Sequence, residues 1–256
     1  MSGLARQVRA EWRKVRTTRL LWGLLAGFLL WTALNVVAQV VAGDQSASAQ
    51  VPALDSAAGL RNVFASSASA AVFTLLLGVI SVTTEFRHDT AVGTFMASPR
   101  RGRVIAAKAI AVPCIAFLYA LLGAGLTLLL AWPLLQWKGI DVALLSGDVP
   151  RILAGSVVAV TVYAVVGVGF GALLRNQVAA IVVALVWMLL ADSLLVSFLP
   201  EVGRWTPGGA AAAMTLGEPI RGGALLGQGA GALLLLGYAV VFCVVGTVTT
   251  VRRDIT

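Results

Sequence analysis

Residues 85–108, EFRHDTAVGTFMASPRRGRVIAAK, form a short basic segment between two long apolar runs and contain the chain's single histidine, His88. Of the 256 residues, 59% are hydrophobic and only 12% are charged, and the mean hydropathy is +0.93. Such a composition lies far outside the range of soluble domains. We therefore interpret the segment as a loop of an integral membrane protein, and the side of the membrane that it occupies determines how the remaining loops are arranged.

The apolar runs predict an all-α polytopic membrane protein with six transmembrane helices. A helix crosses the hydrocarbon core of a bilayer with about 20 residues, and each run has roughly this length. The predicted spans are residues 20–41, 63–84, 104–131, 151–174, 178–199 and 223–248. We expect them to form a single membrane domain over residues 1–256, without a soluble catalytic domain.

The leader before the first span, residues 1–19, has an amphipathic pattern. Apolar residues recur at helical spacing: Leu4, Val8, Trp12 and Val15. Basic residues fill the remaining surface: Arg6, Arg9, Arg13, Lys14, Arg16 and Arg19. This pattern predicts an interfacial helix that lies on membrane lipids. A solvated run of charges that only fixes the topology is the alternative.

The distribution of basic residues predicts the orientation of the bundle. With a cytoplasmic N-terminus, the cytoplasmic face receives the leader, segment 85–108 and the C-terminal arginines, whereas the opposite face mixes basic with acidic residues. Because positive charge concentrates on the cytoplasmic side, both termini and segment 85–108 are predicted to be cytoplasmic. Arginine outnumbers lysine, and alanine and valine are abundant. This usage indicates a GC-rich bacterial genome, and hence the bacterial cytoplasmic membrane.

Signatures of several enzyme and binding classes are missing from the sequence. No lysine follows the glycines of a phosphate-binding loop, and no serine has the G-x-S-x-G context of a nucleophile. One histidine and two separated cysteines predict no metal site. We therefore expect neither a catalytic residue nor a cofactor in this chain. The formal charge of +8 is better explained by topology and anionic lipid headgroups than by nucleic acid.

Polar residues inside the spans are candidates for a substrate path. Thr32, Asn35 and Gln39 share one face of the first span, where they either form hydrogen bonds between helices or line the path. Asp192 lies near the outer end of the fifth span and has either a functional or a hydrogen-bonded structural role. The segment 200–222, broken by prolines and glycines, is either an external loop or a pair of half-helices that re-enter the membrane.

Glycines are clustered in two of the spans. The fourth contains Gly167-x-Gly169-x-Gly171, and Gly227-x-Gly229-x-Gly231 opens the sixth. In apolar helices, small residues at such spacing allow neighbouring backbones to approach closely. We therefore predict tight helix packing at both clusters.

The loop sequence and the order of elements together resemble a known family. The chain has T-x-E-[FY]-R-H-x-T followed by T-F-x-A-S-P-R-R-x-R-V between the second and third spans, after a basic amphipathic leader and before a broken external segment. This layout resembles ABC-2 type transporter permeases, particularly the small bacterial ones. The residues that carry the motif most specifically are Thr83 to Arg87, Thr90, Thr94 and Pro99 to Arg103. Asp89 stands where the family motif usually has glycine.

The resemblance implies the membrane-spanning permease subunit of an exporter. Such a subunit pairs with a second copy or a close paralogue and binds two separate ATPase subunits, which hold the ATP and Mg. The leader would be the interfacial connecting helix, and residues 89–97 the coupling helix seated in a groove of the ATPase. The residues expected to contribute to this coupling are Glu85, Arg87, His88, Asp89, Thr90, Val92, Thr94, Phe95 and Met96.

The residues of the loop are compatible with docking on a partner. Val92, Phe95 and Met96 can form an apolar edge on a short helix. Glu85 and Arg87 flank this edge with opposite charges suited to a polar rim. The alternative is that the loop's bases act only in topology while its apolar residues rest on the membrane.

Two other functional classes stay open on the sequence alone. An ion-coupled secondary transporter would use Asp192 as its ion or proton site, although no inverted pair of broken helices is evident. A membrane scaffold or sensor would bind an ATPase subunit without moving a substrate. The sequence does not identify the substrate.

Overall fold

The computed structural model describes residues 3–44, 52–87, 101–142, 147–174, 176–216 and 224–252. Within these ranges the backbone is helical apart from short connections, and no strand is present. The helices have the following bounds: α1 Gly3–Thr17, α2 Arg19–Asp44, α3 Ala57–Phe64, α4 Ser66–Ser69, α5 Ala71–Arg87, α7 Arg101–Trp137, α8 Val149–Leu174, α9 Gln177–Val186, the π-helical turn η1 Trp187–Ala191, α10 Asp192–Phe198, α11 Pro200–Gly203, α12 Pro207–Met214 and α13 Gln228–Arg252.

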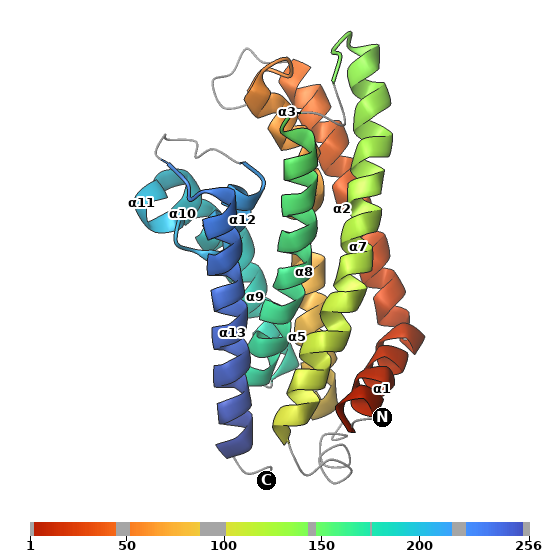
Figure 1. Ribbon diagram of the computed structural model, residues 1–256, viewed down its shortest axis with the longest axis vertical. Coiled ribbons are helices and arrows are strands. Elements are labelled where there is room, and N and C mark those ends of the chain that lie inside the picture. The colour runs from red at the N-terminus through yellow and green to blue at the C-terminus, as the bar shows by residue number, and fades with distance from the viewer. Residues whose placement is uncertain are drawn as a thin grey trace.

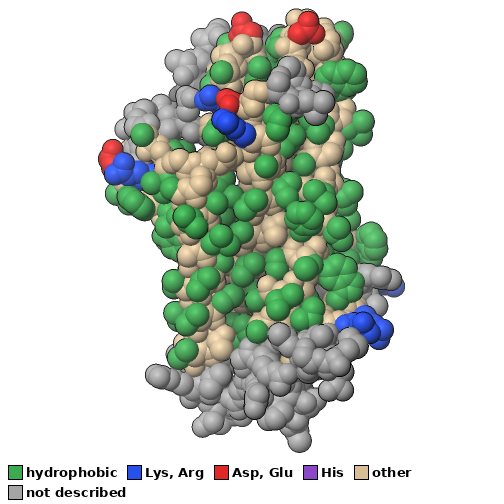
Figure 2. Space-filling view, in the orientation of Figure 1, with side chains coloured by type: hydrophobic (Ala, Val, Ile, Leu, Met, Phe, Trp, Pro, Cys, Tyr) green, Lys and Arg blue, Asp and Glu red, His purple; other side chains and the backbone are tan. Residues whose placement is uncertain are grey.

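Six helical segments of the described residues are long and apolar enough to cross a membrane, so the predicted all-α membrane fold is confirmed. These segments are Arg19–Gly43, Ser66–Glu85, Val104–Trp137, Val149–Leu174, Gln177–Phe198 and Gln228–Thr249. Figure 1 shows an elongated bundle in which both chain ends lie at the end where α7 begins. Apolar side chains cover the middle of the face shown in Figure 2. Helices suit this setting because lipid offers no hydrogen-bond partner to the backbone.

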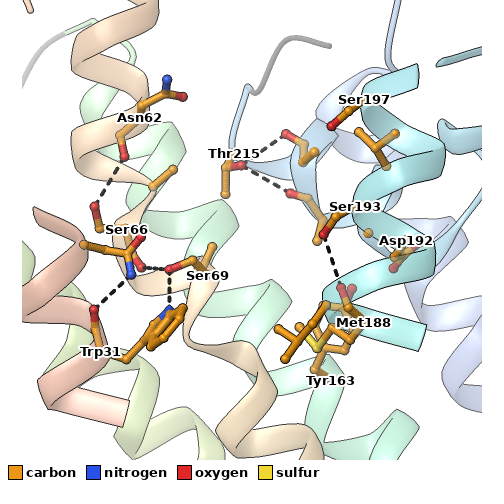
Figure 3. A pocket seen from close by; sticks show the side chains of 18 of the residues that line it. Trp31, Asn62, Ser66, Ser69, Tyr163, Met188, Asp192, Ser193, Ser197 and Thr215 are labelled. Atoms are coloured by element: carbon orange, nitrogen blue, oxygen red, sulfur yellow. Dashed lines mark hydrogen bonds between the residues drawn. The ribbon is translucent and has the colours of Figure 1, made fainter. Parts of the chain in front are cut away.

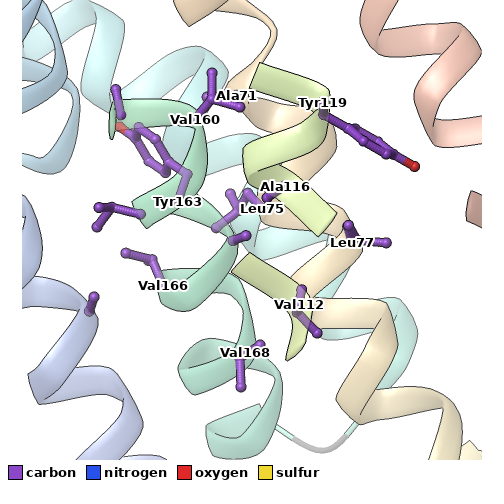
Figure 4. Close-up of a cluster of buried hydrophobic side chains, with 14 of the residues drawn as sticks. Ala71, Leu75, Leu77, Val112, Ala116, Tyr119, Val160, Tyr163, Val166 and Val168 are labelled. Carbon is purple, nitrogen blue, oxygen red and sulfur yellow. The ribbon is translucent and has the colours of Figure 1, made fainter. Parts of the chain in front are cut away.

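The fourth span, α8, is the central helix of the bundle. It packs against α5, α7 and α13, and 61% of its apolar stretch is buried, close to the 67% of the second span and well above the 22% of α2 and of α13. Figure 4 shows how side chains of α5, α7 and α8 interlock around Leu75, Val112 and Val160. The spans formed by α7, α8 and α13 have the same mean hydropathy. Hydropathy therefore does not reveal which of them is buried.

Glycines bring the backbone of α8 directly against two neighbours. A Cβ added at Gly167 would overlap the carbonyl of Leu75 in α5, and one added at Gly169 would overlap the backbone of Cys243 in α13. The close approach predicted for this cluster is confirmed. In the sixth-span cluster only Gly231 contacts another helix, α12, whereas nothing lies within 4 Å of a Cβ at the other two positions. The prediction is wrong there, because those two glycines precede or open α13 on its exposed side.

Several observed span boundaries differ from the predicted ones. The second span begins at Ser66, because residues 57–64 form the separate helix α3, whose N-cap Ser56 accepts a hydrogen bond from the Gly59 N–H. The third continues beyond residue 131 to Trp137, since α7 runs through Pro133. The sixth begins at Gln228 rather than at 223. The fifth contains η1, a type of turn that is often found at functional sites.

The described part of segment 200–222 contains two short helices, α11 and α12. Thr206 caps α12, since its hydroxyl accepts a hydrogen bond from the Gly209 N–H, and Pro207 follows at the first helical position. α12 packs against α8, α10 and α13. Re-entry of this segment into the membrane stays a prediction.

Replacing Gly167 with alanine is expected to lower the thermal unfolding midpoint of the detergent-solubilised protein. The added methyl group would push α8 away from α5, and overpacking of this kind costs about 1–3 kcal/mol. Gly125→Ala in α7 is the matched control, because nothing lies within 4 Å of that position and alanine favours a helix over glycine by up to about 1 kcal/mol. Equal midpoints for the two variants would contradict the close α5–α8 contact.

Candidate functional site

Both ends of segment 85–108 are described, but most of its predicted coupling residues are not. α5 ends at Arg87, and α7 begins at Arg101. The side chain of Arg87 lies outside the described residues, as do these predicted residues: His88, Asp89, Thr90, Val92, Thr94, Phe95 and Met96. The side chain of Glu85 is described, and it belongs to a group of buried charges at the base of the loop.

Four charged side chains from three helices form what we call the ionic cluster: Glu11, Lys14, Glu85 and Lys108. Lys14 Nζ lies 3.0 Å from Glu11 Oε1 and 3.1 Å from Glu85 Oε1. Lys108 Nζ lies 2.5 Å from Glu11 Oε2 and 2.9 Å from Glu85 Oε1. It also donates a hydrogen bond to Ser81 O at 3.0 Å. Each lysine contacts both glutamates, so the four charges alternate and sum to zero.

The ionic cluster is largely withdrawn from water. The side chain of Lys108 is 3% exposed, that of Glu11 7% and that of Glu85 13%, whereas Lys14 is 52% exposed. Removing an ion from water costs several kcal/mol, and close partners of opposite charge are needed to offset that cost. The buried members therefore stabilise the fold only as a set. Because they come from α1, α5 and α7, they join these three helices at the base of the loop.

The ion pairs shift the pKa values of the two members on α1. Burial alone would raise the pKa of Glu11, but Lys108 and Lys14 outweigh burial and lower this pKa below its ordinary value of 4.5. Burial alone would lower the pKa of Lys14, but Glu85 and Glu11 outweigh it and raise this pKa above 10.5. Both groups are therefore charged at neutral pH.

A second candidate site is a cavity of about 470 Å³ lined by residues of α2, α4, α10 and α12, here called the polar cavity (Figure 3). In Figure 3, Trp31, Asn62, Ser66 and Ser69 form one wall, and Asp192, Ser193 and Ser197 form the wall opposite. The first wall comes from α2 to α4 and the second from α10. Hydroxyl and amide groups are therefore concentrated between the first, second and fifth spans.

Three of the four residues predicted for a substrate path line the polar cavity, namely Asn35, Gln39 and Asp192. The fourth, Thr32, is fully buried, and its hydroxyl donates a hydrogen bond to Phe28 O within its own helix at 2.8 Å. The structure therefore assigns Thr32 a local hydrogen bond. The fold brings Asn35 and Gln39 to the same cavity as Asp192, which lies more than 150 residues later in the sequence.

Asp192 has an unusual environment within this cavity. It is 2% exposed, and neither carboxylate oxygen makes a hydrogen bond of good geometry among the described residues, although the Thr206 hydroxyl and the Gly208 N–H lie next to the carboxylate. The hydroxyl of Thr206 is already engaged, since it donates to Gly203 O at 2.8 Å and accepts from the Gly209 N–H at 3.2 Å. The carboxylate faces the first turn of α12, where a Cβ at Gly208 would lie 2.5 Å from Oδ2. The partial positive charge at this helix end favours a carboxylate there.

A family model described as ABC-2 family transporter protein matches residues 7–191. The chain belongs to the ABC-2 transporter family. The matched region runs from α1 to the end of η1 and contains all four members of the ionic cluster. The protein is thus a multi-pass membrane component of an ABC transporter. No curated protein was found to match the chain.

In this ABC-2 permease the leader forms the helix α1, which packs mainly against α7. Trp12 packs against the main hydrophobic core, and Val8 is half-buried. The side chains of Leu4 and Val15, the other two members of the predicted apolar stripe, lie outside the described residues. Placement of α1 on membrane lipid stays a prediction.

Sequence reasoning missed two members of the ionic cluster, Glu11 and Lys108. It counted Lys108 among the cytoplasmic bases and did not consider Glu11 at all. A signal was present in both cases, because Glu11 is the only acidic residue of the leader and Lys108 lies inside an apolar span. A charge inside a span indicates a partner, and a lone acid near several bases is a candidate for that partner.

Replacing Lys108 with methionine is expected to destabilise the solubilised permease by about 3 kcal/mol, because Glu11 and Glu85 would then share only Lys14. The measurement is the free energy of unfolding or, where unfolding is irreversible, the thermal midpoint. Adding Glu11→Leu should recover part of the loss, since Lys14 then balances Glu85. Lys138→Met, an exposed position beyond the far end of α7, is the control and should change stability by less than about 0.5 kcal/mol. Additive effects in the double variant would contradict the pairing.

Stability is also expected to fall in acid in a way that depends on Glu11. Its folded-state pKa is lower than the ordinary value of 4.5, so the unfolded state binds a proton first as the pH falls. The contribution of Glu11 is therefore complete above pH 4.5 and is lost as the pH falls through the lowered folded-state value. Thermal midpoints measured from pH 7 to pH 3 should decline less steeply for Glu11→Gln than for the wild type. Parallel curves would show that the ion pairs of Glu11 do not contribute.

Proposed function

We propose that this permease is the membrane-spanning subunit of an ATP-driven exporter in the bacterial cytoplasmic membrane. Two ATPase subunits bind ATP and Mg and attach to the coupling helix, residues 89–97, of the cytoplasmic loop, with both chain termini on the same side. The permease pairs with a second copy or a close paralogue. The observation that carries the proposal is the ionic cluster, which within an ABC-2 family member joins α1 to both helices that flank the loop.

The ionic cluster supports mechanical coupling between the loop and the bundle. Lys108 follows the start of α7 by two helical turns, and Glu85 lies two residues before the end of α5. A displacement of the loop therefore moves Glu85 and Lys108, and the ion pairs of these two residues with Lys14 and Glu11 move α1 with them. Coupling also requires that ATP-bound and nucleotide-free partners hold the loop in different positions, since only a differential interaction shifts an equilibrium.

In the proposed complex, docking relies on residues inside the loop. Val92, Phe95 and Met96 form the apolar edge that enters the ATPase groove, and Arg87 contributes to the polar rim. The carboxylate of Glu85 pairs with Lys14 and Lys108 inside the permease. Its role is therefore to hold the base of the loop in position. His88, Asp89, Thr90 and Thr94 complete the proposed coupling segment.

The exposed faces of the bundle are compatible with a permease pair embedded in lipid. The apolar stretches of α2 and α13 are only 22% buried, and that of the fifth span is 17% buried. Large apolar side chains on these helices, including Trp22, Val182 and Leu233, are more than half exposed. Lipid chains or the apolar surface of a second permease can cover such faces, whereas water would not favour them.

An ion-coupled secondary transporter is the second candidate, because Asp192 is a buried carboxylate without a partner of opposite charge among the described residues. In such a protein, Asp192 would bind the coupling ion. Transport driven by an ion gradient and unaffected by depletion of ATP would favour this candidate. Loss of transport on ATP depletion, with the ion gradients clamped, would exclude it.

Replacing Phe95 and Met96 with aspartate is expected to abolish substrate-linked ATPase activity in the reconstituted complex. The two charges would face the apolar groove of the ATPase and weaken docking, which co-purification of the partner ATPase with the permease would measure. Trp137→Asp, at the opposite end of α7 and 81% exposed, is the control. Full activity and normal co-purification of the double variant would contradict the proposed docking contact.

A further inference from the structure

Asp192 lies at the boundary between two cavities of different character. The polar cavity described above is one of them. The other has a volume of about 300 Å³, shares Tyr163, Met188 and Asp192 with the first, and is here called the aromatic cavity. Figure 3 shows Tyr163, Met188 and Asp192 on one side of the polar cavity.

The lining of the aromatic cavity suits the apolar part of a ligand. Besides Tyr163, it is lined by four aromatic side chains: Phe170, Trp187, Tyr238 and Phe242. Phe170 and Phe242 pack edge to face at 5.7 Å between ring centroids, and Tyr238 stacks on Phe242 at 6.4 Å. The Tyr238 hydroxyl donates to Trp205 O at 2.9 Å, so its hydrogen bond is already made. The rings therefore offer mainly apolar edges and faces.

Among the described residues that line the two cavities, Asp192 is the single Asp, Glu, Lys or Arg. The described residues contain no group of three or more His, Cys, Asp or Glu side chains that could hold a metal ion. One carboxylate is a poor site for a divalent metal, which prefers several oxygen ligands. It is sufficient for the single positive charge of an ammonium or a similar organic cation.

Energetics favour such a ligand. A buried carboxylate without a partner is costly, and the cost falls when an opposite charge is placed against it. Aromatic rings add a further attraction for an organic cation. The aromatic cavity would exclude water from the apolar body of the ligand, while the amides and hydroxyls of the polar cavity would bind its polar substituents. A neutral or anionic ligand of the same shape would gain nothing from Asp192.

We propose that Asp192 and the aromatic cavity form the cargo site of this transporter, and that the cargo is an amphipathic organic cation. The positive group lies against the Asp192 carboxylate, and the apolar body lies among Tyr163, Trp187 and Phe242. Gly208 matters for this geometry, because a larger residue there would displace the carboxylate. This proposal rests on the proposed transport function, because it names the class of substrate that the transporter would move.

Tetraphenylphosphonium and tetraphenylborate test the proposal, because they have the same shape and opposite charge. Titration calorimetry on the purified full-length permease in detergent should show saturable binding of the phosphonium. Binding of the borate should be at least tenfold weaker after subtraction of its partition into empty micelles. Asp192→Asn should weaken phosphonium binding at least tenfold and leave borate binding unchanged. Phe242→Ala should weaken phosphonium binding several-fold.

Two controls separate a binding role from a structural one. Asp141→Asn, an exposed position after α7, should bind the phosphonium like the wild type. Asp192→Asn should unfold at the same temperature as the wild type or a higher one, because it removes a buried charge that no cation of the described residues balances, and the amide can still occupy the same position. A lowered midpoint would assign Asp192 a structural role and overturn the proposal. Equal binding of the phosphonium and the borate would also overturn the proposal. So would an increase of the thermal midpoint by Na⁺ alone, if Asp192→Asn abolished that increase.

These measurements are independent of the ATPase. Normal phosphonium binding together with ATP-independent transport would refute the proposed exporter and leave the cation site intact. Normal ATP-driven coupling without discrimination between the two probes would refute the cation site and leave the exporter intact.

Discussion

A charge inside an apolar bundle must have a partner, and this constraint explains both candidate sites of the permease. Lys108 is almost fully buried, so it requires Glu11 and Glu85, and these come from two other helices. Meeting the requirement joins α1, α5 and α7 at the base of the loop. Asp192 is equally buried but has no partner of opposite charge among the described residues. The first site is balanced within the chain, whereas the second is complementary to a cation from outside.

The central position of α8 connects these two regions. Its glycines allow α5 and α13 to pack against its backbone, so the core between them is tight. Tyr163 of α8 lines both cavities beside Asp192. The neighbouring helix α5 carries Glu85 of the ionic cluster near its C-terminal end. In the proposed exporter, a tilt of α5 at the ionic cluster would therefore change the packing of α8, the helix that carries Tyr163 in the cavity wall. Packed cores transmit such shifts because they contain little free space.

The family explains why an energy-coupling site would lie in a chain without a phosphate-binding loop. A membrane component of an ABC transporter depends on another subunit for nucleotide hydrolysis. Movement at its contact with that subunit must therefore be transmitted to the membrane spans. In the proposed exporter, the ionic cluster would provide a direct physical route, because Glu85 and Lys108 lie at most two helical turns from the loop. Its neutrality matters, since an unbalanced charge at this depth would destabilise the bundle.

The sequence by itself determined the class of fold, the number of spans, the ABC-2 family motif and the candidacy of Asn35, Gln39 and Asp192, because apolar runs, charge positions and short motifs are local properties. It did not determine that α8 is central, since three spans have the same mean hydropathy. Nor did it show that Glu11 meets Lys108, or that Asp192 faces an aromatic cavity. Those facts depend on contacts between residues far apart in the chain. Only the tertiary structure decided which buried charges have partners.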